Sequence, residues 1–212
     1  MKVVIFGATG MVGKQLVTHC MAKEWQVRAF GRNVEHLFAF ESHHKSNFEV
    51  FKGYIFDDKN VGDAIKGADY VLSALGGTLS GEDRARSLGM KHIVQQMQKR
   101  GVKRIVAVGG TGVLPDSTGK YLFKDKDYDP LYIPVSEEHA KAYEYLKGSD
   151  LDWTFVCPPL IVDADADNKF QAVAESIGPS MEINSGNLAL FMVQELQRNG
   201  FVHQRVGIGN TR

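Results

Sequence analysis

Cysteine, net charge and long apolar runs are all scarce in this sequence of 212 residues. Its two cysteines, Cys20 and Cys157, stand in apolar segments without a second ligand at metal spacing, which predicts reduced core thiols and a reducing, cytoplasmic compartment. Lysine plus arginine equal aspartate plus glutamate at 25 each. No global charge therefore draws the chain to nucleic acid or to anionic lipid.

The remaining absences exclude further classes of protein. No apolar run is long enough to cross a bilayer, and the N-terminus reads as a strand followed by glycines rather than as a secretory signal. The pair His43–His44 lacks partners at metal-ligand spacing, so we expect no metal site. A small molecule is the expected partner, and we expect a monomer or a weak homodimer.

Short β-branched runs alternate with longer helical patterns along the chain. This alternation predicts an α/β fold, a Rossmann-type doubly wound parallel sheet formed by a single domain over residues 1–212. Weakly periodic, polar residues 164–180 suit a loop or a small C-terminal extension on the substrate side. The strands expected from β-branched runs are Lys2–Phe6, Gln26–Phe30, a strand near Val50, Tyr70–Ser73, Arg104–Val108, Trp153–Cys157 and Gln204–Ile208.

Helices are expected between these strands. The first covers Met11–Lys23, and a long crossover helix covers Asp83–Arg100 and stops at Gly101. Ser136 followed by acids predicts a helix N-cap, with the helix running to about Lys147. A last helix is expected over Asn187–Arg198.

The segment from Val3 to Lys14 has a strand, a three-glycine turn and a helix in the order that a pyrophosphate site requires. Gly7 permits the tight turn, Gly10 lets the backbone approach phosphates, and Gly13 lets the helix pack closely on the strand. The helix N-terminus supplies free N–H donors and a partial positive charge. The turn therefore predicts a dinucleotide site in which Thr9, Met11 and Val12 also contact the ligand.

The end of the second strand indicates which dinucleotide binds. An NAD-selective site would place an acid there to accept hydrogen bonds from the ribose hydroxyls. The sequence instead offers Arg32, whose guanidinium suits a 2′-phosphate. We therefore predict NADP(H) as the cofactor, against the alternative that Arg32 is an ordinary surface arginine.

Four motifs carry a resemblance to a known superfamily. The chain resembles atypical short-chain dehydrogenases/reductases, and within them it is most similar to the small NAD(P)H-binding group of biliverdin-IXβ/flavin reductases and NmrA-like proteins. The motifs are Gly-Ala-Thr-Gly-Met-Val-Gly at 7–13, Leu-Ser-Ala-Leu-Gly at 72–76, Ile-Val-Ala-Val-Gly-Gly-Thr at 105–111, and Leu-Asp-Trp-Thr at 151–154 leading to Pro158-Pro159.

The resemblance implies how the coenzyme lies. A nicotinamide would lie across the C-terminal ends of the strands, with its carboxamide near the backbone of Leu160 and Ile161. By the same resemblance, further coenzyme contacts are expected from Ala74, Leu75, Gly76, Gly110 and Pro158.

Members of the superfamily with a Tyr-x-x-x-Lys dyad use the lysine to lower the pKa of the tyrosine, which passes a proton to a carbonyl. Tyr143 and Lys147 have this spacing here. However, the tail that follows the dyad in relatives aligns on Leu146, which places the family tyrosine at Val135 and the family lysine at His139. The dyad is therefore predicted to be absent.

Two other residues are candidates for the chemistry. Thr111 follows the strand Arg104–Val108, where relatives carry a small hydroxyl residue near the nicotinamide, and the alternative is a threonine that caps a turn. His139 could orient the nicotinamide ribose or donate a proton, and the alternative is an exposed first-turn histidine.

These observations predict an NADPH-dependent oxidoreductase that transfers hydride to a small acceptor such as a flavin, quinone, tetrapyrrole or carbonyl compound. A flavin or quinone can take its proton from water, so the missing dyad does not exclude turnover. The alternative is a non-catalytic, NmrA-like redox sensor. The acceptor pocket is expected from segments 78–86, 114–133 and 162–180.

Overall fold

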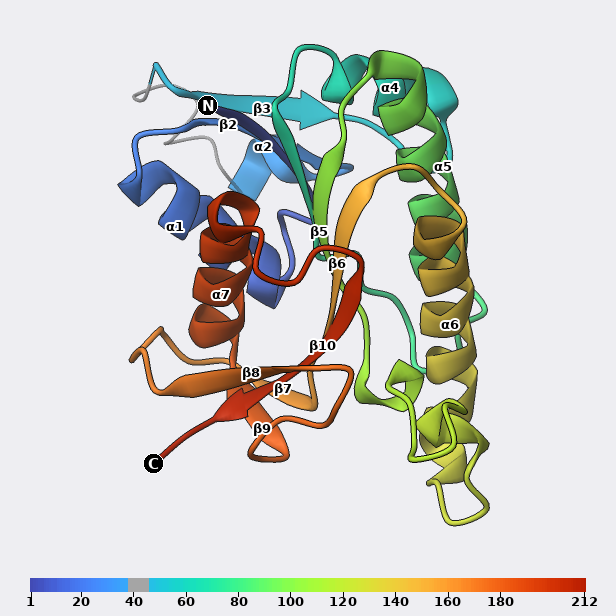
Figure 1. Ribbon diagram of the computed structural model, residues 1–212. Helices are drawn as coiled ribbons and strands as arrows, with labels where there is room; N and C mark the ends of the chain where they lie inside the picture. The colour runs from blue at the N-terminus through green and yellow to red at the C-terminus, as the bar shows by residue number, and fades with distance from the viewer. Residues whose placement is uncertain (38–45) are drawn as a thin grey trace.

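The computed structural model describes residues 1–37 and 46–212, and the pair His43–His44 lies outside them. The chain forms an α/β fold in which a mainly parallel sheet of eight strands is flanked by helices (Figure 1). The Rossmann-type architecture predicted from the alternating pattern is therefore confirmed.

The strand order is β3-β2-β1-β4-β5-β6-β10-β8. Neighbouring strands run parallel except β10 and β8, which are antiparallel. The order reverses between β1 and β4, and ligands of open α/β sheets bind outside the carboxyl ends of the strands at such a switch point. The strands are β1 (Lys2–Phe6), β2 (Gln26–Gly31), β3 (Phe48–Lys52), β4 (Tyr70–Ser73), β5 (Arg104–Val108), β6 (Asp152–Cys157), β8 (Phe170–Ala174) and β10 (Gln204–Asn210).

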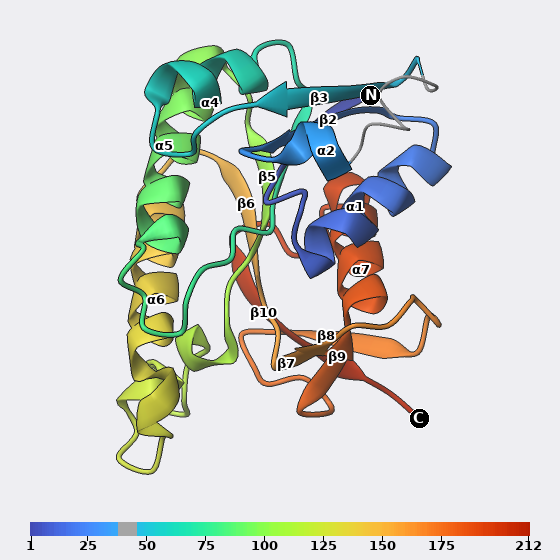
Figure 2. The ribbon, with the colours of Figure 1, turned by 180° about the vertical axis from the view of Figure 1, so that it is seen from behind.

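Helices cover both faces of the sheet. Helices α1 and α7 pack together on one face, and α4, α5 and α6 pack side by side on the other (Figures 1 and 2). The helices are α1 (Met11–Ala22), the short α2 (Val34–Leu37), α4 (Asp58–Ile65), α5 (Ala85–Arg100), α6 (Ile133–Lys147) and α7 (Ser185–Arg198), with single 3-10 turns η1 (Thr111–Val113), η2 (Leu122–Lys124) and η3 (Pro130–Tyr132).

Strand β1 shows why the sequence forms a two-sided core. Val4 and Phe6 are fully buried against the side of α4, α5 and α6, whereas Val3 and Ile5 are fully buried against the side of α1 and α7. Side chains alternate between the faces of a strand, so a central strand covered on both faces needs an unbroken apolar run.

Helix α6 begins earlier than the sequence predicted. It starts at Ile133, and Ser136 is not its N-cap. Pro134 fits the first turn, where its missing N–H has no intrahelical acceptor to lose, and η3 leads directly into the helix. Ser136 is instead buried, with its hydroxyl 3.0 Å from that of Tyr128.

Two other helices also start elsewhere. Helix α5 begins at Ala85, because Arg84 before it has a left-handed backbone (φ +50°) that cannot continue the helix, and the Asp83 carboxylate accepts the N–H of Ala85 (3.0 Å). It ends as predicted at Gly101, with φ +71°. Helix α7 begins at Ser185, two residues before the expected Asn187, whose buried amide donates to Asp167 Oδ1 (2.7 Å) and Asn210 Oδ1 (3.1 Å).

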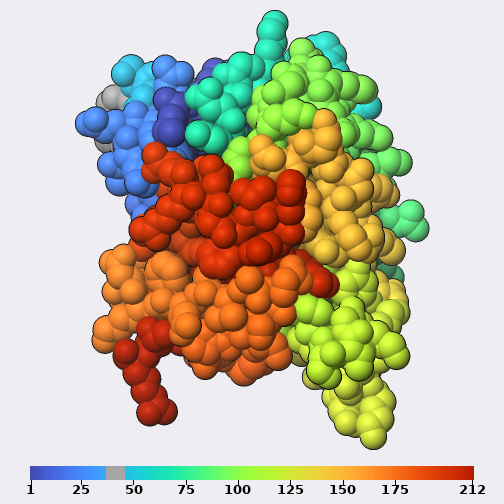
Figure 3. Space-filling model, in the orientation of Figure 1, coloured from blue at the N-terminus to red at the C-terminus, as the bar shows by residue number. Residues whose placement is uncertain are grey.

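The C-terminal segment contains more regular structure than a loop. Residues 170–174 form β8, the antiparallel edge strand of the main sheet, and β7 (Leu160–Val162) pairs in parallel with β9 (Glu182–Asn184) as a second small sheet. In the space-filling view the residues of this region, orange to red, form one continuous surface beside a yellow-green segment (Figure 3).

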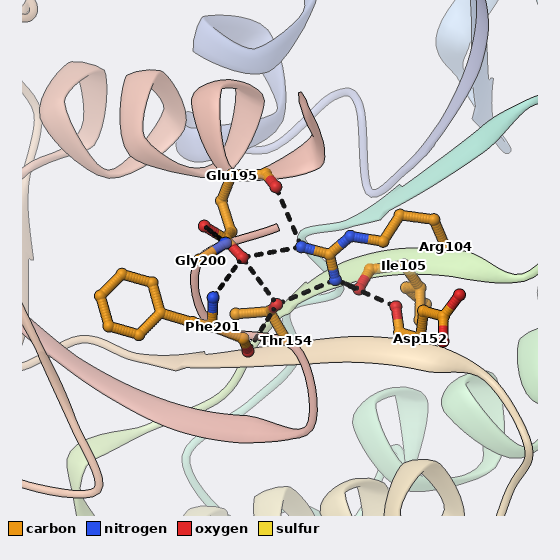
Figure 4. Close-up of polar contacts among 7 residues, drawn as sticks. All are labelled: Arg104, Ile105, Asp152, Thr154, Glu195, Gly200 and Phe201. Carbon is orange, nitrogen blue, oxygen red and sulfur yellow. Dashed lines mark hydrogen bonds and ion pairs between the residues drawn. The ribbon is translucent and has the colours of Figure 1, made fainter. Parts of the chain in front are cut away.

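A buried ion pair joins β5, β6 and α7 at the amino end of the sheet (Figure 4). Arg104 Nη2 donates to Glu195 Oε1 (2.8 Å), and Arg104 Nη1 donates to Thr154 Oγ1 (2.9 Å). The same carboxylate accepts the N–H of Phe201 (2.8 Å) and that of Gly200 (3.2 Å). One carboxylate thus fixes the turn between α7 and β10 to two central strands.

Candidate functional site

The glycine turn lies at the carboxyl end of β1. Gly7 has φ +78°, and an added Cβ would meet Ala74 O at 2.3 Å. At Gly13 a Cβ would meet Gly7 O at 2.0 Å, so the helix could not approach the strand with any side chain there. Gly10 N donates to Gly7 O (3.1 Å) and closes the turn.

Helix α1 presents an uncompensated N-terminus to this turn. Gly10 is its N-cap and offers no side chain to cap it, and the first turn holds no acidic residue. The free backbone N–H groups and the helix dipole therefore favour an anion at this position.

A cavity of about 600 Å³ opens beside the turn at the carboxyl ends of the strands. Eleven of the predicted site residues line it: Gly7, Thr9, Gly10, Met11, Val12, Arg32, Ala74, Leu75, Gly76, His139 and Ile161. The other lining residues are Phe30, Gly31, Gly53, Tyr54, Ile55, Phe56, Gly77, Asp83, Ala85, Arg86, Val108 and Gly109.

Five predicted residues lie outside this lining. Gly13 supports the turn from behind, and Leu160 is exposed on β7. Gly110 lies against His139, since an added Cβ would come within 3.0 Å of its ring carbon Cδ2. Thr111 Oγ1 donates to Pro158 O (2.9 Å) and so holds the turn after β6. The catalytic role of Thr111 stays a prediction.

Arg32 and Tyr54 mark the end of the cavity next to β2 and β3. The Arg32 guanidinium lies 5.9 Å from the centre of the Tyr54 ring, close enough for a cation–π contact. Both side chains are exposed. A guanidinium that is held over an aromatic ring and open to solvent can receive a phosphate group.

His139 lies at the other end of the cavity and is 9% exposed. Within residues 1–37 and 46–212, three buried side-chain polar atoms have no hydrogen-bond partner: Ser73 Oγ, Arg104 Nε and His139 Nδ1. Of these three residues, only His139 lines the cavity. Burial, reinforced by the charge of Arg86, lowers the pKa of His139 to about 3. The imidazole is therefore neutral at neutral pH.

Arg86 lines the cavity and lies in the predicted acceptor segment 78–86, but no individual role was predicted for it. Its Nη1 donates to Thr78 O and its Nη2 to Gly77 O, both at 2.9 Å. Asp83 accepts the N–H of Thr78 (2.7 Å) within the same loop. The other two predicted acceptor segments, 114–133 and 162–180, contribute no lining residue.

A sequence profile described as NAD(P)H-binding matches residues 7–199. This chain belongs to that NAD(P)H-binding family. The match begins at the first glycine of the turn and extends through α7, so it includes every residue that lines the cavity.

Three solved structures share the fold over nearly the whole chain. A Burkholderia pseudomallei protein provisionally described as exported is 29% identical, with a TM-score of 0.83 and 99% of both chains covered. A Streptococcus pneumoniae protein provisionally described as an NADH-flavin reductase is 23% identical, with a TM-score of 0.82 and both chains covered in full. The anaerobilin reductase of Escherichia coli O157:H7 is 20% identical, with a TM-score of 0.82 and coverage of 99% and 97%.

The chain is also similar to curated proteins. Sterol demethylase protein B of Methylococcus capsulatus is 26% identical over 175 residues, which covers 76% of this chain and 52% of that protein. The chain therefore spans about half the length of this curated relative.

The cavity of this NAD(P)H-binding chain fits a dinucleotide. The turn that contains Gly7 and Gly13 admits no side chain, and the N-terminus of α1 is free to bind a phosphate. An added Cβ on Gly76 would find no protein atom within 4 Å, so the space above this backbone is open. These features leave room for a ligand where the helix field favours negative charge.

Tyr143 and Lys147, the two residues with Tyr-x-x-x-Lys spacing, do not line this site. Tyr143 is 6% exposed in the core on the side of α6, and the Arg205 guanidinium lies 5.0 Å from its ring centre. Burial raises the pKa of its phenol. Neither Tyr143 nor Lys147 lines the cavity, so the NAD(P)H-binding site contains no such pair.

The cysteines, possible metal ligands and helix lengths indicate no further site in the part of the chain that the structure describes. Cys20 and Cys157 are free and buried, and burial raises the pKa of each thiol to about 12, which makes both unreactive. Over residues 1–37 and 46–212, no cluster of side chains could hold a metal ion. In the same part of the chain, no helix is both long and apolar enough to cross a membrane.

Proposed function

We propose that the protein is an NADPH-dependent oxidoreductase that transfers hydride directly to a small acceptor such as a flavin, quinone, tetrapyrrole or carbonyl compound. One observation carries the proposal: a single cavity joins the glycine turn to the half-buried Arg86 and the buried His139. The reductases of flavin and of anaerobilin that share the fold support this choice of acceptors.

Different residues of the cavity would bind different parts of the coenzyme. The turn at Gly7, Gly10 and the N-terminus of α1 would hold the pyrophosphate, and Arg32 would receive the 2′-phosphate that distinguishes NADPH from NADH. When bound, the coenzyme supplies the hydride. The apolar lining of Leu75, Val108 and Ile161 excludes water from a planar acceptor.

The two roles considered for His139 separate on electrostatic grounds. A group whose pKa is lowered to about 3 carries no extra proton to donate at neutral pH. It can still donate or accept one hydrogen bond as a neutral ring. We therefore assign His139 to positioning, and the acceptor takes its proton from water.

The proposal is tested by binding and by turnover. NADPH and NADH are titrated into the protein while nicotinamide fluorescence is followed, and FMN, biliverdin and a quinone are then added while the reduced-nicotinamide absorbance is recorded. Oxidation above the rate without protein supports a reductase. Tight binding of NADPH with no turnover across the panel would instead favour the redox-sensor alternative.

We extend the proposal to the cellular setting. The two unpaired cysteines support a reducing, cytoplasmic location, and the balanced charge supports the absence of nucleic acid and membrane partners. The proposed assembly is a monomer or a weak homodimer. Cell fractionation tests the location. Light scattering over a range of protein concentrations tests the assembly.

A further inference from the structure

The cavity contains two arginines, and they occupy different positions along the sheet. Arg32 follows β2, whereas Arg86 donates to the carbonyl oxygens of Gly77 and Thr78 in the loop after β4. Strand β1 stands between β2 and β4, so two strand spacings, roughly 10 Å, separate the ends of these two strands. The 2′-phosphate assigned to Arg32 leaves Arg86 without a ligand group.

Arg86 is held in place by neutral acceptors. Its two terminal nitrogens donate to the carbonyl oxygens of Thr78 and Gly77, at 2.9 Å each. A guanidinium fixed in this way loses little side-chain entropy when it binds an additional group. Arg86 is therefore preorganised at the wall of the cavity.

The nearby carboxylates do not pair directly with Arg86. No carboxylate oxygen in residues 1–37 and 46–212 forms an ion pair with Arg86 within 4.0 Å. Asp83 accepts the backbone N–H groups of Thr78 and Ala85, and Glu138 accepts from Ser87 Oγ (2.5 Å) and Lys141 Nζ (2.9 Å). The Arg86 charge faces the cavity without a contacting counter-ion.

The imidazole of His139 is a second polar group that lines the same cavity as Arg86. His139 Nδ1 is buried without a hydrogen-bond partner, although the residue lines the cavity. Nδ1 itself is closed to solvent, so the cavity is bordered by other parts of the ring and not by this atom. Desolvation lowers the pKa of the half-buried Arg86, and the charges of Asp83 and Glu138 act in the opposite direction.

We propose that Arg86, with His139 beside it, binds an oxyanion of the acceptor, so that the protein selects planar acceptors that carry a phosphate or carboxylate. This inference rests on the proposed function and deepens it, because it names the class of acceptor. Hydrogen bonds to charged groups contribute about 1.5–3 kcal/mol, which corresponds to roughly 10- to 100-fold in affinity. The anionic member of a matched pair should gain that factor.

Matched pairs of ligands test this inference by binding alone. FMN and riboflavin differ in one phosphate, and biliverdin and its dimethyl ester differ in two carboxylates. Dissociation constants are measured with NADP⁺ at saturation, from the fluorescence of the flavins and the absorbance of the tetrapyrroles. The wild-type protein should bind the anionic member of at least one pair about tenfold or more tightly.

Variants assign the preference to Arg86. Arg86→Gln keeps a donor for the Thr78 carbonyl but removes the charge, and it should reduce the preference to within about twofold while leaving the affinity for the neutral member unchanged. Arg86→Lys should keep part of the preference. Arg84→Gln is the matched control, because Arg84 is exposed and does not line the cavity.

Three outcomes decide between the explanations. Equal binding of both members of each pair by the wild-type protein would overturn the inference, even if NADPH reduces them. A loss of NADP⁺ affinity in Arg86→Gln with an unchanged preference would assign Arg86 to the coenzyme pyrophosphate and would also overturn it. An anionic preference without any turnover would support the inference and contradict the proposed reductase.

Discussion

The amino and carboxyl ends of the sheet differ in how their charged and polar side chains are paired. At the amino end, Arg104 and Glu195 are almost completely buried, and apart from Arg104 Nε their polar atoms are paired with each other and with neighbouring groups. At the carboxyl end, His139 is buried with Nδ1 unpaired, and the half-buried Arg86 donates to the carbonyls of Gly77 and Thr78 without a carboxylate in direct contact, within the part of the chain that the structure describes. The first arrangement stabilises the fold without a ligand, and the second leaves groups for a ligand to satisfy.

This contrast separates the part of the sheet that stabilises the fold from the part that can bind a ligand. A buried ion pair needs nearly complete hydrogen bonding, because the desolvation of each charge is costly. A charged side chain that lines a cavity and has no carboxylate in direct contact can instead gain a partner when a ligand binds. The amino end should therefore govern unfolding, and the carboxyl end should govern affinity.

The largest expected effect is on stability at the amino end. Glu195→Ala leaves Arg104 buried without its counter-ion and also frees the N–H groups of Gly200 and Phe201. We expect the free energy of unfolding to fall by about 3–5 kcal/mol, measured by urea denaturation. The control Asp63→Asn removes a partner of the exposed ion pair with Lys59 and should change little. Equal effects of both variants would contradict the contrast.

The second effect is the pH dependence created by His139. The folded chain holds its pKa at about 3, below the ordinary value of 6.5, so the unfolded chain binds a proton first as the pH falls. Stability due to the neutral ring is therefore complete above pH 6.5 and is lost between 6.5 and 3, by up to about 1.4 kcal/mol per pH unit.

The variant His139→Leu tests this linkage. It should be less sensitive to acid than the wild-type protein over that pH range, when the free energies of unfolding are compared at several pH values. His19 also has a pKa lowered by burial, so it contributes a background that both proteins share. Parallel curves for the variant and the wild type would show that His139 is not held neutral.

The third effect is on coenzyme choice. Arg32→Ser removes the guanidinium proposed to receive the 2′-phosphate, so the affinity for NADPH should fall by about tenfold or more while that for NADH changes by less than about twofold. Nicotinamide fluorescence measures both. Arg198→Ser, an exposed arginine outside the cavity, is the control. A similar loss for NADH and NADPH would refute the assignment of Arg32.

How much of the site the sequence could predict depends on how local each interaction is. The glycine turn depends mostly on neighbours within segment 7–13, where Gly13 packs against Gly7 O, and the residue types indicate this geometry; the approach of Ala74 O to Gly7 is its one distant contact named here. Thr111 is different, because the acceptor of its hydroxyl is Pro158, 47 residues away. His139 was expected in a first turn, but α6 begins at Ile133, so the histidine lies in the second turn and is buried.

Arg86 shows the same limit. Its position depends on the loop after β4, where Gly77 and Thr78 present carbonyl oxygens to it. An added Cβ at Gly77 would come within 2.5 Å of the Asp83 carboxylate and 2.9 Å of Arg86 Nη1. This compact loop follows no periodic pattern, so sequence reasoning could name the segment 78–86 but not the side chain that lines the cavity.

The smallest expected effect on stability comes from a glycine that lines the cavity. Gly76→Ala adds a methyl group that meets no protein atom within 4 Å, so the free energy of unfolding should change by less than about 0.5 kcal/mol. The methyl group enters the space proposed for the coenzyme, so the affinity for NADPH should nonetheless fall severalfold. The matched control is Gly109→Ala, whose Cβ would come within 2.3 Å of the Phe155 ring and should lower stability as well. If Gly76→Ala bound NADPH as tightly as the wild type, the coenzyme would not pass over this part of the cavity. The proposal that the carboxyl end of the sheet governs coenzyme affinity would then fail at this position.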